Sequence, residues 1–155
     1  MDGYVLAKTV HVLSSTVLLG TGAGIAFFMW RAHRTRDARV IAAVAADVVR
    51  ADFLFTTTAV VLQPATGFLM LWELGYPWTA PWIRWSLLLY VLVGCCWLPV
   101  VWLQLRLRDM LGAKLAGRAV DEMRFQRYVR WWFALGWPAF VGLVAVFGLM
   151  VAKPA

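Results

Sequence analysis

The sequence predicts an all-α integral membrane protein, folded as a four-helix bundle with both termini on the outer side of the membrane. Two observations predict this class. The 155 residues are 63% hydrophobic and only 15% charged, whereas a soluble domain averages about 45–50% apolar and about 25% charged residues. In addition, four stretches of 20 to 22 residues lack any Asp, Glu, Lys or Arg. Disordered chains and water-soluble globular domains are therefore disfavoured, and the length suits a single domain, residues 1–155.

Each charge-free stretch is long enough to cross a hydrocarbon core of about 30 Å at a rise of about 1.5 Å per residue. Since lipid cannot satisfy backbone polar groups, each stretch is expected to be a helix. None alternates with a period of two, as the strands of a membrane barrel do. The first stretch is too long for a signal peptide and follows no basic cluster. The charge-free stretches are residues 9–30, 53–72, 85–105 and 131–152. With the flanking residues included, the predicted spans are residues 5–30, 53–73, 84–105 and 131–152.

The basic residues predict the orientation of these spans. Twelve of the 15 Lys and Arg lie in two segments, 31–52 and 106–130. Because positively charged loops stay cytoplasmic, both termini are expected on the outer side of a bacterial inner membrane. The net charge of +7 then reflects topology, and no nucleic-acid partner is expected. The predicted aromatic belts are Tyr4, Trp72, Tyr76, Trp78 and Trp82 on the outer side and Trp30, Trp102, Tyr128, Trp131 and Trp132 on the inner side.

The segments between the spans are expected to be partly helical. Residues 38–52 are interpreted as a cytoplasmic extension of the second helix, and residues 115–130 as a short amphipathic lead-in to the fourth. Pro64 removes a backbone hydrogen bond and is expected to kink the second helix. The same helix carries a stripe of residues at spacings of four, three, four and four, namely Asp52, Thr56, Ala59, Gln63 and Gly67.

His11 is the most informative polar residue, because it lies about 10 Å inside the outer interface marked by Tyr4. Ionisable residues at that depth face the bundle interior. Lys8 is three residues away and shares its helix face, as do Ser15, Leu18 and Gly22. A cation one turn away favours a neutral imidazole, the form that a haem iron or another metal requires. A structural histidine bonded across helices, with Lys8 reaching the interface, fits the same pattern.

Three further positions complete the sequence-level site. Arg84 enters the third helix at the level of Lys8 and could pair with a haem propionate or with Glu73. His33 lies among arginines and is expected to be solvated. It is also about 33 Å from His11 along a helix, so the two histidines of one chain cannot ligate one haem. Gly20 and Gly24 form a GxxxG pair, which allows close helix approach or room for a flat ligand.

Several runs resemble a bacterial family of four-helix proteins identified as predicted integral membrane proteins of unknown function. The resemblance covers essentially the whole chain. It is carried by YVLAKTVH at 4–11, GTG at 20–22, ADFLFT at 51–56, QPATG at 63–67, CWLPVV at 96–101 and LMVAKP at 149–154.

The opening with Lys8 and His11, together with Arg84, is more distantly similar to the HemJ-type protoporphyrinogen oxidases and to copper-resistance membrane proteins. In the HemJ-type family a first-helix His is implicated in binding haem b, and a third-helix Lys is important for function. The resemblance implies that His11 is the haem ligand and that Arg84 stands at the Lys position. Arg can bind a carboxylate but does not easily act as a base.

Three functions follow as hypotheses. The first is a haem b-binding protein for redox chemistry or porphyrin handling, with His11, Lys8 and Arg84 at the cofactor. The second is a non-catalytic membrane subunit or assembly factor. The third is a transporter for a small solute or a metal ion, although no internal repeat is evident. The expected partners are the lipid bilayer and a second copy of the chain or a larger membrane complex.

Overall fold

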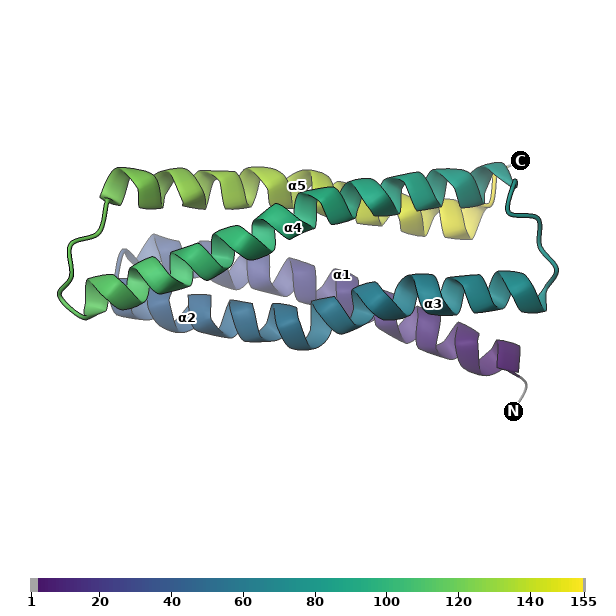
Figure 1. The fold of residues 1–155 in the computed structure, drawn as a ribbon, viewed down its shortest axis with the longest axis horizontal. Helices are drawn as coiled ribbons and strands as arrows, with labels where there is room; N and C mark the ends of the chain where they lie inside the picture. The colour runs from purple at the N-terminus through teal and green to yellow at the C-terminus, as the bar shows by residue number, and fades with distance from the viewer. Residues whose placement is uncertain (1–2, 155) are drawn as a thin grey trace.

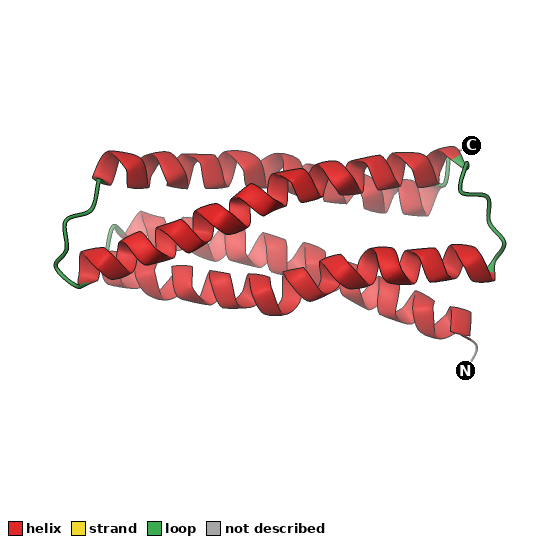
Figure 2. Ribbon diagram, viewed as in Figure 1, coloured by secondary structure: helices red, strands yellow, loops and turns green. Residues whose placement is uncertain are grey.

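The computed structural model describes residues 3–154, and these residues form helices joined by short loops (Figure 1, Figure 2). The all-α prediction is confirmed. The chain runs back and forth along the long axis of the molecule, and both ends of the chain lie at the same end of it as the 74–80 connection. The elements are α1 (Gly3–Thr35), α2 (Ala38–Ala51), the π-helical segment η1 (Asp52–Thr56), α3 (Thr57–Glu73), α4 (Pro81–Leu115) and α5 (Glu122–Ala152).

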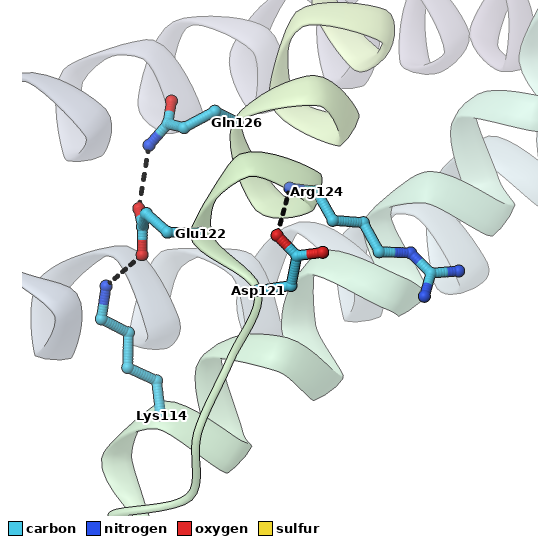
Figure 3. Close-up of polar contacts among 5 residues, drawn as sticks. All are labelled: Lys114, Asp121, Glu122, Arg124 and Gln126. Carbon is cyan, nitrogen blue, oxygen red and sulfur yellow. Dashed lines mark hydrogen bonds and ion pairs between the residues drawn. The ribbon is translucent and has the colours of Figure 1, made fainter.

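Helices α1, α4 and α5 are longer than the predicted spans. The predicted lead-in at 115–130 is shorter than expected, because α4 continues to Leu115, residues 116–121 form the connection, and only residues 122–130 lead helically into the fourth span. Asp121 caps α5 by accepting a hydrogen bond from the backbone N–H of Arg124 at 2.9 Å. Lys114 Nζ lies 2.8 Å from Glu122 Oε2 across the connection (Figure 3). The hydrogen bond from Lys114 lowers the pKa of Glu122.

The second pass contains α2, η1 and α3, with right-handed helical backbone angles at both junctions. Within it, the backbone N–H of Thr57 donates to the carbonyl of Asp52, five residues back instead of four. The expected extension of the second helix over 38–52 is therefore helical. The predicted span 53–73 is divided between η1 and α3, and α3 by itself has 17 residues.

Pro64 lies inside α3 and leaves the carbonyl of Val60 without its helical N–H donor. The structure compensates across helices, because Tyr90 of α4 donates its hydroxyl to the Val60 carbonyl at 2.5 Å. Helical hydrogen bonding continues through residues 57–73 despite the proline. The proline thus creates a polar contact between α3 and α4.

Among the described residues, α1, α4 and α5 are each long and apolar enough to cross a membrane. Large apolar side chains cover their outer surfaces, with Leu13 62% and Trp137 68% exposed. A soluble protein rarely exposes apolar surface on this scale. The composition of the surface is that of a protein in contact with lipid.

The apolar core occupies the half of the molecule away from the termini. It contains Met29, Ala32, Ile41, Ala45, Val48, Val100, Leu103, Leu107, Leu111, Phe125 and Trp132. Two predicted belt residues, Trp132 and Trp82, are buried instead: Trp132 bonds to Gln104 of α4, and Trp82 packs against Tyr76 and Lys153. The other predicted belt residues are exposed or half-buried.

The glycine pair of α1 does not mediate a close approach within the chain, contrary to one expectation. A Cβ built at Gly20 or Gly24 would meet no atom within 4 Å. The close approach lies elsewhere, at Gly142 of α5, where a Cβ would lie 2.8 Å from Val93 Cγ2 of α4. Gly142 therefore allows α4 and α5 to pack together.

Candidate functional site

A cavity of about 290 Å³ lies at the end of the molecule that carries the termini. It is formed by the first turns of α1, the last turns of α3, the first half of α4 and the last turns of α5 (Figure 1). Its volume lies just below the range of about 300–1,000 Å³ that is typical of ligand sites. The walls are mostly apolar, and the polar lining includes Lys8, His11, Gln63, Tyr90 and Lys153.

His11 is half-buried in this cavity, and hydrogen bonds fix its ring. Its Nδ1 lies 2.9 Å from Thr66 Oγ1. The Thr66 hydroxyl has one proton, which it donates to the carbonyl of Leu62 at 2.6 Å. With its proton on the Leu62 carbonyl, Thr66 Oγ1 accepts from Nδ1–H, and we assign the tautomer of the neutral ring accordingly, with the lone pair on Nε2. Within residues 3–154 no protein group forms a hydrogen bond with this Nε2.

Gln63 holds the same turn of α1 against α3. Its Nε2 donates to the carbonyl of His11 at 2.7 Å and to Ser14 Oγ at 2.6 Å. Gly67 completes the contact, since a Cβ there would lie 3.5 Å from His11 Cε1. The stripe from Asp52 to Gly67, over η1 and α3, is turned toward the other helices, with Asp52, Thr56 and Ala59 buried and Gln63 and Gly67 half-buried. On α1, however, Ser14 is buried in place of the predicted Ser15, whose hydroxyl donates to its own helix at Val12.

The structure brings one of the two predicted cations to the cavity. Lys8 lines it, with its ammonium 5.8 Å from the Tyr4 ring centroid. Arg84 is exposed and is not part of the lining. A second lysine takes the expected place, because Lys153 lines the cavity with its ammonium 5.6 Å from the ring centroid of Trp82.

His33 does not belong to this site. Its ring packs against Phe125 and Phe133 of α5, with centroids 6.1 and 6.4 Å apart. The expectation of a solvated side chain is wrong, because the end of α1 packs against α5 at this point. Its Nε2 is buried and has no protein partner among the described residues.

A second polar cluster lies outside the cavity, around Asp52 of η1. Asp52 Oδ2 accepts from Gln104 Nε2 at 2.6 Å, and Oδ1 accepts from Trp97 Nε1 at 3.3 Å. Gln104 Oε1 in turn accepts from Trp132 Nε1 at 3.2 Å. The cluster thus joins η1, α4 and α5.

Sequence reasoning placed Asp52 on an inward stripe but did not find its partners. The available signal was Gln104, an amide within a charge-free stretch, because such a group needs a partner inside the protein. Lys153 was missed as well. Its position could have indicated a role, because Lys153 directly follows the predicted span 131–152 and is therefore expected on the same side of the membrane as Lys8.

The comparisons with known proteins support the membrane assignment. The family model described as "Predicted integral membrane protein (DUF2269)" matches residues 5–154. Neither the curated proteins nor the solved structures contain a match to the chain. The similarity to HemJ-type enzymes thus remains a prediction. Because the family match covers nearly the whole chain, the protein belongs to the DUF2269 family of predicted integral membrane proteins.

Proposed function

We propose that the chain forms a membrane-spanning four-helix bundle in a bacterial inner membrane, with both termini on the outer side. The second span is then η1 and α3 together, residues 52–73, which the absence of Asp, Glu, Lys and Arg from residues 53–72 supports. The α1–α2 and α4–α5 connections lie at one end (Figure 1), and the segments around them, 31–52 and 106–130, carry 12 of the 15 Lys and Arg. Arg34, Arg106 and Arg124 stack there on aromatic rings. That end is accordingly cytoplasmic.

We further propose that the cavity binds haem b through His11, for redox chemistry or porphyrin handling. The observation that carries this proposal is the orientation of the imidazole. A histidine that ligates a metal usually donates its other ring N–H to a fixed acceptor, and Thr66 Oγ1 is such an acceptor for Nδ1. The Nε2 lone pair remains available as a ligand to iron. Bound haem would supply one-electron chemistry at this position.

Other residues that line the cavity suit the propionates and the porphyrin ring of haem b. Lys8 and Lys153 are cations suited to the two propionates. Met70 and Met150 line the same cavity, and a methionine thioether serves as a second axial ligand in some haem proteins. The apolar walls suit a porphyrin ring. Met70 and Met150 are therefore further residues of the lining that could hold the iron.

The test is the absorption spectrum of the detergent-purified protein after expression with ample haem. The wild type is expected to show a Soret band with about one haem per chain. His11→Ala should lose the band, because the axial nitrogen is gone, whereas His33→Ala is the matched control and should keep it. A colourless wild type would contradict haem binding, an unaltered spectrum for His11→Ala would contradict binding through His11, and either result would favour the non-catalytic membrane subunit or assembly factor.

A further inference from the structure

Asp52 is the one buried acidic side chain among residues 3–154. It is 2% exposed, and its partner Gln104 is 0% exposed. The other acidic residues in this part of the chain are exposed, namely Asp37, Asp47, Glu73, Asp109, Asp121 and Glu122. An acidic group in the interior of a membrane protein is costly and commonly has a function.

Asp52 has no cationic partner in the described residues. No Lys, Arg or His nitrogen lies within 4.0 Å of its carboxylate. Its hydrogen-bond donors Gln104 and Trp97 are neutral, and so is the Thr56 hydroxyl beside it. On the neighbouring elements, Cys96 of α4 is half-buried and His33 of α1 packs against α5, but neither bonds to Asp52. An ionised carboxylate here would lack charge compensation.

A hydrogen-bond acceptor is present beside this carboxyl group. Thr56 lies four residues further along η1, is 4% exposed, and its Oγ1 has no protein partner in the described residues. A carboxylic acid differs from a carboxylate in having one O–H to donate. The Thr56 hydroxyl can donate to a carboxylate as well as accept from a carboxylic acid, so the neutral form is favoured here because a proton on Asp52 removes the uncompensated charge.

We infer that Asp52 is a proton-binding site in the interior of the protein. The neutral acid accepts from Gln104 at one oxygen and donates its O–H to Thr56 Oγ1. The π-helical register at η1 supports this assignment, since such segments occur frequently at functional sites. The inference does not depend on haem, because the cluster lies outside the cavity.

Infrared spectroscopy tests this inference on the full-length protein, because a protonated carboxyl group absorbs apart from carboxylates and amides. At neutral pH the wild type is expected to show one protonated-carboxyl band. Asp52→Asn should remove the band. Asp47→Asn should retain it, because Asp47 is 73% exposed at its side chain and is paired with Arg50. No such band in the wild type, or a band that persists in Asp52→Asn, would overturn the inference.

A second variant covers the case in which Asp52→Asn does not fold. Thr56→Val keeps the carboxyl group but removes its acceptor, so the band should move to higher frequency. An unshifted band in Thr56→Val would show that the proton is not donated to Thr56 and would contradict the inferred site.

Discussion

The orientation of His11 depends on Thr66, because a threonine hydroxyl has one proton and Thr66 gives it to its own helix. Its oxygen is left to accept from Nδ1–H of His11 at 2.9 Å. The depth of His11 in the first predicted span was enough to predict that it faces the interior. Thr66 could not be predicted as its partner, since a spacing within one helix does not fix the register of the next.

Two lysines, and not Arg84, are expected to hold the acidic groups of the ligand. Lys8→Ala and Lys153→Ala should each weaken haem binding, whereas Arg84→Ala should match the wild type because its side chain does not line the cavity. Lys8 is exposed to solvent, so the loss should be about 1 kcal/mol, or roughly fivefold in Kd. Haem titration of the apo-proteins measures this, and weakening by Arg84→Ala alone would restore the sequence-based assignment.

Gln104 is predicted to contribute to stability, because it bonds to both Asp52 and Trp132 inside the protein. Gln104→Leu should lower the free energy of unfolding by about 1–3 kcal/mol for each buried group left unpaired. Gln126→Leu is the matched control, since Gln126 is exposed and bonds to Glu122 at the surface (Figure 3). Equal thermal stability of the two variants in detergent would argue against a stabilising cluster at Asp52.

At the scale of the helices, the sequence predicted where apolar segments lie but not how far each helix continues. Charge-free stretches mark the part of a helix that lipid can cover, whereas α4 and α5 extend past them with polar and charged residues. The glycine pattern likewise did not predict which glycine makes a close helix contact. A GxxxG pattern permits close packing, yet Gly142 makes the close contact because α5 packs against α4 at Val93.

Gly142→Leu should therefore destabilise the protein more than Gly20→Leu. A side chain at Gly142 would collide with Val93 Cγ2, at a cost of about 1–3 kcal/mol for overpacking. Gly20 faces open space, where replacing glycine in a helix adds about 0.5–1 kcal/mol of stability. Thermal unfolding in detergent compares the two, and greater destabilisation by Gly20→Leu would point to a contact made by α1 with a second chain.

Over the whole molecule, one half contains the apolar core and the other half contains the cavity. The core lies near the connections rich in basic residues, and the cavity lies near the termini (Figure 1). The fold class and the stripes of His11 and Asp52 follow from composition, charge and spacing. The cavity could not be predicted in this way, because it forms where α1, α3, α4 and α5, which are distant in sequence, lie around a common space at one end of the molecule.

The topology predicts that reporters fused before Met1 and after Ala155 lie on the outer side of the membrane. A reporter inserted at Gly117 should lie in the cytoplasm, because this glycine is in the 116–121 connection, within the basic segment 106–130, and adopts a φ of 72° in the turn. The insertion there avoids interrupting a helix. A cytoplasmic C-terminus with intact spans would reverse the orientation and place the cavity on the inner side.

Ligand rescue tests the role of His11 most directly, because it separates ligation from a structural role. His11→Gly should fold, with a helix cost of about 1 kcal/mol, and should show no Soret band with haem. Added imidazole should then enter the space left by the side chain and restore the band, while Thr66 remains as the acceptor for its N–H. A folded His11→Gly protein that binds haem without imidazole, or that imidazole does not restore, would contradict axial ligation by His11.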